Sequence, residues 1–344
     1  MALFTDATLR DALAVLQTRN ARIQALIDAT EPSTWKKIQN DVKTGHASDY
    51  PIGTRLTDKY VYNNTEYDFP WIVVDNNRPV TWEDGSVHPS LILLAEYASI
   101  QSVPFDAPED TVVDAEETTA LDGWYYWGKT NEGNVYTALN LSVGDSIPHS
   151  SYDSIHRCAI NSLDILRYGY NRYKDSAMRQ FINSSMPKNY WWESKHTGDI
   201  APSQAASYDG FLLGFGNDFL SVINPVKVQV ATNTVTDGGV TDVMYDRFWL
   251  PSVEELYGSP QVADVEGAYW PYIKTITGLD SPSNNANDGR ITYALENHSS
   301  AQAVRGRSAY RGNAYYTWIC TYTGQIYYTY SYNAYRARVA CAIS

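Results

Sequence analysis

The chain has 344 residues, a length that suggests two domains or one large domain with an appendage. Hydrophobic residues make up 44% and charged residues 19%, a composition that supplies a sizeable core and excludes a disordered chain. The net charge is −13 and the Lys and Arg residues form no cluster, which excludes a nucleic-acid-binding surface. No run of residues approaches the roughly 18 apolar positions that a transmembrane helix needs, so membrane insertion is excluded as well.

The first residues predict an amphipathic helix over 5–29. Apolar residues recur there at heptad spacing, with Asn20 as the polar exception; the seam is Leu9, Leu13, Leu16, Asn20, Ile23 and Ile27. Such a seam is typical of a short coiled coil that makes a homo-oligomer, although an amphipathic helix lying on its own domain has the same pattern. The start of the chain lacks the basic and apolar regions of a secretory signal peptide. Three cysteines are too few for a disulfide framework, which fits assembly in a reducing cytosol.

The rest of the chain divides by composition near residue 120. Residues 34–118 alternate short apolar runs, such as Trp71–Val74 and Leu91–Leu94, with turn residues, and this pattern predicts a small β-rich region. The part that follows is rich in Trp, Tyr, Gly and Asn, with one helix expected around 175–185 and short strands over the last 55 residues. We therefore expect three parts: an N-terminal helix (1–31), a small β-rich domain (32–120) and a larger C-terminal domain (121–344).

Tyrosine is concentrated near the C-terminus, because nine of the 28 Tyr residues lie between Tyr310 and Tyr335. Rigid, amphipathic Tyr among small polar residues is the composition of antibody-type binding surfaces. The alternative is a Tyr-rich antiparallel sheet with one face in the core. The candidate ligand-binding residues are Tyr310, Arg311, Asn313, Tyr315, Tyr316, Tyr322, Tyr327, Tyr328, Tyr330, Tyr332 and Asn333. We expect some of them to be buried, and we expect Trp318, Arg336 and Arg338 to be scaffold.

No catalytic or metal-binding motif is recognisable. The chain has no phosphate-binding loop, no nucleophile elbow and no zinc helix, so we expect no catalytic residue, metal or other cofactor. The three Gly residues at 210, 214 and 216 suggest a turn between strands rather than a dinucleotide site. Ser252 and Glu255 have the spacing of a capping box, a structural use of that carboxylate. Cys320 and Cys341 are expected to be small buried hydrophobes.

Several blocks together resemble a known family. They are Trp35–Gly45 (WxxIQxxVxxG), Ser176–Ser184 (SAMRQFINS), Asp246–Gly258 (DRFWLPSVEELYG) and Arg336–Ile343 (RARVACAI). In this order they are similar to the C-type-lectin-like, formylglycine-generating-enzyme-type domains of phage and gut-bacterial proteins. The resemblance implies an α+β, C-type-lectin-like fold with short antiparallel strands and few helices, preceded by the small β-rich region and the N-terminal helix. Val339 stands where that family usually has Pro.

One branch of this family comprises the variable proteins of diversity-generating retroelements, in which template adenines are mutated into the 3′ end of the gene. From an Asn codon this process reaches Tyr, Ser and similar residues but not Lys, Glu, Gln, Met or Trp. Residues 303–344 contain no Lys, Glu or Met, and Trp318 and Gln325 would be fixed scaffold. The resemblance therefore implies a variable region over about 303–338.

The function that this implies is that of a phage or prophage receptor-binding protein. It would be assembled in the bacterial cytoplasm, carried on the virion near the tail with other virion proteins, and would bind a bacterial surface protein or glycan. A trimer is the oligomer we favour. The rivals are a carbohydrate-binding module of fixed specificity, a structural virion decoration or adhesin domain, and an oxidase of the formylglycine type, whose cysteine motif we do not find here.

Overall fold

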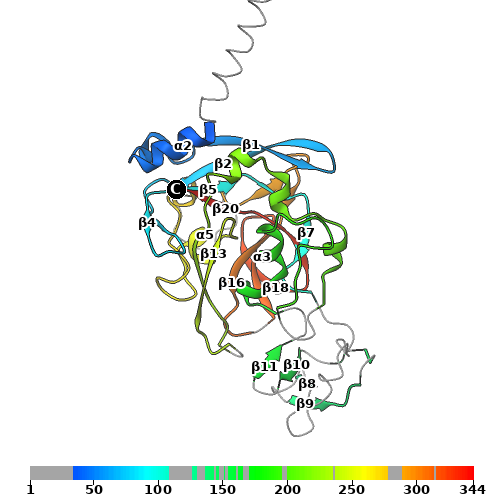
Figure 1. The fold of residues 1–344 in the computed structure, drawn as a ribbon. Coiled ribbons are helices and arrows are strands. Elements are labelled where there is room, and N and C mark those ends of the chain that lie inside the picture. Colours follow the sequence, from blue (N-terminus) through cyan, green and yellow to red (C-terminus); the bar gives the residue numbers. More distant parts are fainter. Residues whose placement is uncertain are drawn as a thin grey trace, which may run out of the picture.

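The computed structural model describes residues 34–107, 126–129, 136–142, 145–146, 151, 154–159, 162–165, 170–195, 200–234, 237–277, 289–313 and 315–344. The helix expected over 5–29 lies outside these residues. The described part is mixed α+β, with short strands in several small, largely antiparallel sheets and few helices (Figure 1). The α+β class expected from the sequence is therefore confirmed. None of the helices in this part of the chain has the length and apolarity to cross a membrane.

One sheet joins the two ends of the described chain. Its strands, in spatial order, are β1 (Arg55–Tyr62), β2 (Thr65–Asp75), β5 (Leu91–Ala95) and β20 (Ala340–Ile343). All neighbours are antiparallel, and β1 and β2 are joined by a tight Asn63-Asn64 turn with positive φ at both residues. The two apolar runs expected to be strands lie in β2 and β5, and both runs are buried.

The boundary expected near residue 120 does not separate two cores among the described residues. β5 pairs with β20, and β7 (Ser102–Pro104) pairs with β19 (Ala334–Ala337). Buried side chains from Trp35 to Ile343 form a single hydrophobic cluster. One reason is that β5 is apolar on both faces, and such a strand needs a neighbour on each side and cover above and below.

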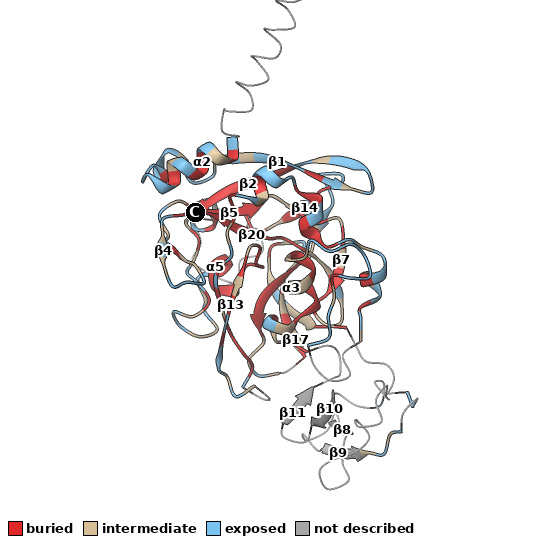
Figure 2. Ribbon diagram, viewed as in Figure 1, coloured by how far each residue is buried: buried red, intermediate tan, exposed pale blue. Residues whose placement is uncertain are grey.

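A five-stranded sheet carries the Tyr-rich segment. In spatial order it consists of β18 (Ile326–Tyr330), β17 (Tyr316–Cys320), β16 (Val304–Ala309), β19 and β7. β17 is antiparallel to both β16 and β18, whereas β19 is parallel to β16. Every residue of β16 is buried, and this strand appears red through the middle of the molecule in Figure 2. The Tyr-rich hairpin therefore lies at one edge of a sheet that is anchored in the core.

The other strands in the described part of the chain form four further sheets. They are β3 (Val80–Thr81) with β4 (Val87–His88); β6 (Tyr97–Ala98), β14 (Thr292–Ala294) and β15 (Ala301–Gln302); β12 (Val226–Ala231) with β13 (Thr241–Asp246); and β8 (Tyr126–Lys129), β9 (Tyr136–Leu139), β10 (Ser154–Ala159) and β11 (Ser162–Ile165). The short strands expected over the last 55 residues are confirmed by β14 to β20.

The helices are short. The α-helices are α2 (Thr34–Lys43), α3 (Ala177–Ile182), α4 (Asn217–Leu220), α5 (Val253–Tyr257) and α6 (Pro271–Thr277), and the 3₁₀ helices are η1 (Ala47–Asp49), η4 (Tyr173–Asp175), η5 (Ser203–Ala206) and η6 (Phe211–Gly214). α3 confirms the helix expected around 175–185, and Ser176 caps it by accepting from the Arg179 N–H. The Ser252–Glu255 capping box is also present, at the start of α5.

Two local expectations were wrong. Residues 34–43 are a helix rather than part of a β-rich region, because Trp35, Ile38 and Val42 fall on one face and are buried together. Gly210, Gly214 and Gly216 do not make a turn between strands. Gly210 precedes η6, Gly214 ends it and Gly216 precedes α4. A Cβ at position 214 would overlap the Tyr60 ring. Glycine is required there because a core tyrosine packs directly on the backbone.

Candidate ligand-binding surface

Most of the candidate tyrosines lie on the β17–β18 hairpin and the turns beside it. The register places Tyr316 opposite Tyr330 and Trp318 opposite Tyr328. Residues directly opposite each other in an antiparallel pair share a face, and so do residues two apart on one strand. These four aromatic side chains therefore stand on the same face of the hairpin, and Trp318, expected to be scaffold only, stands among them.

The rings on this face touch one another. Tyr328 is at the centre, with ring centroids 4.7 Å from Tyr310, 5.0 Å from Tyr316 and 6.0 Å from Trp318. Tyr316 also lies 4.9 Å from Tyr330. These separations are those of favourable aromatic pairs. We call Tyr310, Tyr316, Trp318, Tyr328 and Tyr330 the ring cluster. All five are partly exposed.

The other candidate tyrosines differ in exposure. Tyr322 and Tyr327 are the most exposed, at 64% and 58%, and Tyr332 stacks on Tyr330 with 5.5 Å between centroids. Tyr315 is only 4% exposed, because its ring is covered by Tyr316 and Tyr330. The Tyr315 ring is thus a core contact rather than part of the exposed surface. The expectation that some candidates would be buried holds for this residue.

The polar candidates take part in local hydrogen bonds. Asn313 Oδ1 accepts from the Tyr315 N–H at 2.8 Å, and Asn333 Nδ2 donates to Thr329 Oγ1 at 2.9 Å. Arg311 Nη1 donates to the Thr232 carbonyl at 2.8 Å. All three side chains are half-buried, so each has a structural contact as well as an exposed part. Arg336, expected to be scaffold, forms a bidentate ion pair with Glu296.

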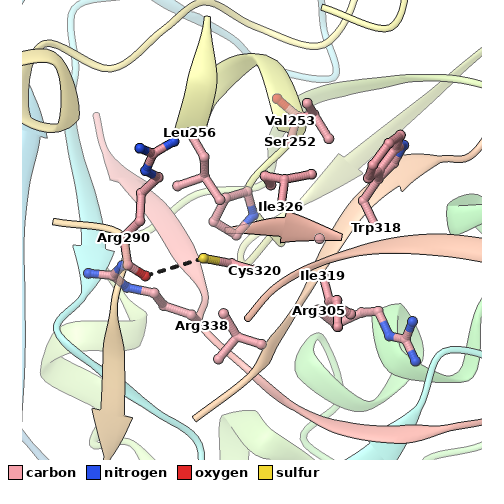
Figure 3. Close-up of a pocket in the computed structure, with 13 residues that line it drawn as sticks. Ser252, Val253, Leu256, Arg290, Arg305, Trp318, Ile319, Cys320, Ile326 and Arg338 are labelled. Atoms are coloured by element: carbon pink, nitrogen blue, oxygen red, sulfur yellow. Dashed lines mark hydrogen bonds between the residues drawn. The ribbon is translucent and has the colours of Figure 1, made fainter. Parts of the chain in front are cut away.

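A small cavity lies at the inner end of the same hairpin face. Trp318, Cys320 and Ile326 line one side and Val253 and Leu256 of α5 the other (Figure 3). Its volume of about 10 Å³ leaves room for one water-sized group at most. The face of the hairpin therefore changes from an exposed aromatic surface to a packed contact with α5.

Cys320 and Cys341 are both buried free thiols, as expected. Cys320 Sγ donates to the Arg290 carbonyl at 3.4 Å, the dashed line in Figure 3. Burial raises the pKa of the Cys320 thiol to about 11 and raises the pKa of Cys341 well above its ordinary value. A thiol that stays protonated is a poor nucleophile and a poor metal ligand. Among the described residues, no three His, Cys, Asp or Glu side chains are grouped so that they could hold a metal ion.

A buried ion pair joins α5 to β16. Glu255 Oε2 accepts from Arg307 Nη1 at 2.5 Å and from the Ser252 N–H at 3.0 Å, and both charged side chains are buried. Arg307 also donates to the backbone carbonyls of Leu250 and Glu266. The pair lines a cleft of about 270 Å³ beside β3 and β12. Because Glu255 is occupied by Arg307 and by the capping box, its role here is structural.

Glu266, beside this pair, gives a testable pH dependence. Burial raises the pKa of its carboxyl, which accepts from the Ala231 N–H at 3.0 Å and from the Ser308 hydroxyl. A carboxyl with a raised folded pKa stabilises the fold most below its unfolded pKa, and loses that contribution as the pH rises through the folded pKa. Gln at position 266 can bond at both sites without ionising, because its Oε1 can accept from the Ala231 N–H and its Nε2 can donate to the Ser308 hydroxyl oxygen. We expect the unfolding free energy of the native chain, relative to E266Q, to fall as the pH rises above about 4.5. Urea unfolding of both chains across pH measures this, and a constant difference would contradict it.

The fold and the surface define a mixed α+β protein that presents an uncharged, hydroxyl-bearing aromatic surface on its last β-hairpin. The comparison with protein families matches residues 155–344 to a family described as "Domain of unknown function (DUF6273)". This match covers more than half of the chain, which therefore belongs to that family. Neither the curated proteins nor the solved structures contain a match.

Proposed function

We propose that this chain is a ligand-binding protein of the C-type-lectin-like, formylglycine-generating-enzyme type, and that the ring cluster with its exposed neighbours is its binding surface. The observation that carries the proposal is the ring cluster itself: four half-exposed aromatic side chains on one face of the β17–β18 hairpin, with the Tyr310 ring, next to β16, packed against them. Tyr and Trp supply large contact area at a small cost in side-chain entropy, which is why binding surfaces are rich in them.

The distribution of charge supports the same proposal. None of the 39 acidic residues lies after Glu296, although the chain as a whole is acidic. Of the five arginines in that last segment, three are buried, Arg336 is paired with Glu296, and Arg311 is half-buried and donates to the Thr232 carbonyl. The surface therefore offers hydroxyl groups, amides and ring faces, with Arg311 as its charged residue and no acidic group. Such a surface suits a bacterial surface protein or glycan bound by stacking and hydrogen bonds.

We further propose that the segment over about 303–338 is diversified by a retroelement and that the protein is carried on a virion. The absence of Lys, Glu and Met from residues 303–344 supports diversification, because that mechanism does not reach those residues from an Asn codon. In this proposal the protein is an oligomer, and several weak sites act together through avidity. It is not an enzyme, and the protonated, buried Cys320 and Cys341 are consistent with that.

The second candidate is a carbohydrate-binding module of fixed specificity, or a structural virion decoration. The mutual contacts of the ring cluster favour the carbohydrate-binding module over the structural decoration, because sugar rings can stack on adjacent aromatic side chains that do not vary. The experiment that separates the candidates is to sequence the 3′ end of the gene from many sibling isolates. Substitutions confined to template adenines between about Ala303 and Arg338 are expected from diversification. Uniform sequences would contradict it and favour the fixed module.

A further inference from the structure

A buried asparagine lies directly beneath the loop that leads into the hairpin. Asn171 is fully buried, and its Nδ2 donates to the carbonyls of Asn313 at 2.6 Å, Tyr316 at 2.9 Å and Tyr310 at 3.3 Å. The three carbonyls belong to residues of the candidate surface. One amide group therefore binds the backbone carbonyls of residues 310, 313 and 316.

The orientation of that amide is itself determined. Asn233, also fully buried, donates from Nδ2 to Asn171 Oδ1 at 2.9 Å and to Asp237 Oδ2 at 3.0 Å. Asp237 in turn accepts from the Tyr170 hydroxyl. Because Asn171 Oδ1 is occupied by a donor, its NH₂ group must face the three carbonyls. The network thus specifies a donor at this point and excludes an acceptor.

A buried arginine binds the backbone carbonyls of the turn after β18. Arg305 is 1% exposed, and its Nη2 donates to the carbonyls of Asn333 at 2.6 Å and Tyr330 at 3.2 Å, while Nη1 donates to Thr317 Oγ1. Its guanidinium also lies 4.7 Å from the Tyr335 ring centre. No carboxylate pairs with it among the described residues, and burial lowers the pKa of Arg305 to about 9. The buried positive charge of Arg305 is therefore stabilised by the two carbonyls, Thr317 Oγ1 and the Tyr335 ring rather than by an ion pair.

We infer that Asn171 and Arg305 are positioning residues, which hold the backbone of residues 310–316 and 330–333 from the core side and so keep the ring cluster in its arrangement. Both residues bind main-chain carbonyls, which are the same whatever side chain a position carries. The backbone would then keep its path when the displayed side chains change. The link to changing side chains rests on the proposed function. The positioning of the backbone is a property of the free protein.

The test compares each residue with a matched control elsewhere in the chain: a half-buried asparagine for Asn171 and a buried arginine for Arg305. Asn183 donates to the Arg179 and Phe248 carbonyls and accepts from the Arg247 and Phe248 N–H groups. N171D and N183D therefore make the same chemical change at two places. Arg338, like Arg305, is a buried arginine that donates to carbonyls, here those of Ala95 and Gly289. Figure 3 shows the Arg305 and Arg338 side chains directed to opposite sides of the cavity. R305K and R338K are thus a second matched pair.

The measurements are amide hydrogen exchange by mass spectrometry, near-UV circular dichroism and Tm on the free full chain. We expect all four variants to lower Tm. N171D should increase amide hydrogen exchange in 310–316 about tenfold or more, because it removes the donor of three hydrogen bonds. R305K should do the same in 330–333, because lysine cannot reproduce the several hydrogen bonds of the guanidinium. Both should weaken the near-UV signal of the coupled rings. N183D and R338K should change neither readout at temperatures well below their Tm.

The inference is overturned if the controls alter exchange in these segments as much as N171D and R305K do, or if N171D and R305K leave it unchanged. If N171D does not fold, N171S removes the donors without adding a carboxylate and is held to the same criteria. No ligand enters these measurements. Uniform sibling sequences would therefore overturn the proposed diversification but not the positioning role of Asn171 and Arg305. Unchanged hydrogen exchange in N171D and R305K would overturn the positioning role but not the proposed diversification.

Discussion

Replacing Tyr328 with alanine is expected to reduce ligand binding by about 30-fold or more, the effect of losing a binding hot spot of about 2 kcal/mol. Tyr328 has ring contacts with Tyr310, Tyr316, Trp318 and Tyr327, so its removal opens the centre of the ring cluster. Under the proposed function the ligand is a bacterial surface molecule, so the measurement is retention of the protein on bacterial cells as a function of protein concentration.

Two other tyrosines provide the controls for Tyr328. Tyr190 is 66% exposed and lies outside the candidate ligand-binding residues, so Y190A should change neither binding nor Tm appreciably. Tyr315 is buried, and Y315A should cost about 3–5 kcal/mol of unfolding free energy, as large aromatic truncations in a core do. If Y328A lowers stability as Y315A does and binding only in proportion, Tyr328 is a core residue and the proposed surface is wrong.

Replacing Arg307 with methionine is expected to cost about 3–5 kcal/mol of unfolding free energy, because it leaves buried carboxylates without their positive partner. Arg307 is 3% exposed in its side chain, contacts Glu255 at 2.5 Å and lies against the backbone of Glu266. Urea unfolding of the native chain and of R307M measures the difference. Adding Glu255→Gln to R307M should recover part of the loss, since Gln can also complete the capping box with Ser252.

The matched control for R307M is R336M. Arg336 also contacts a glutamate, Glu296, at 2.5 Å, but the two side chains are 17% and 32% exposed. An ion pair that is partly in water is worth about 0–1 kcal/mol, so R336M should have a small effect. Equal losses in R307M and R336M would show that burial does not set the strength of the Glu255–Arg307 pair, contrary to our expectation.

Local features of the fold were predictable from the residues that form them. The capping box of α5, the apolar stripe of α3, and the strands that contain Trp71–Val74 and Leu91–Leu94 all depend on neighbours within a few positions. The helix at Thr34–Lys43 also has a local signal, because its buried residues have helical spacing. The turn residues of the region that follows favour strands, and the β-rich expectation extends that pattern too far towards the N-terminus.

The candidate surface was predictable only in part. The Tyr-rich composition marked the correct segment, but not which rings touch or which one is buried. Tyr315 and Tyr316 are adjacent in sequence and differ in burial, because strand pairing decides which face each occupies. Asn171 gave no signal at all, since its carbonyl partners lie about 140 positions away.

The sequence by itself determined the α+β class, the short helices and strands with local signals, the burial of both C-terminal cysteines and the unusual chemistry of the last segment. The tertiary structure alone decided that β5 pairs with β20, that one core spans both halves, and that Asn171 and Arg305 support the hairpin. The physical reason is that helix periodicity, capping and turns depend on residues that are close in the chain. Strand pairing and buried side-chain contacts depend on which distant segments the whole chain brings together.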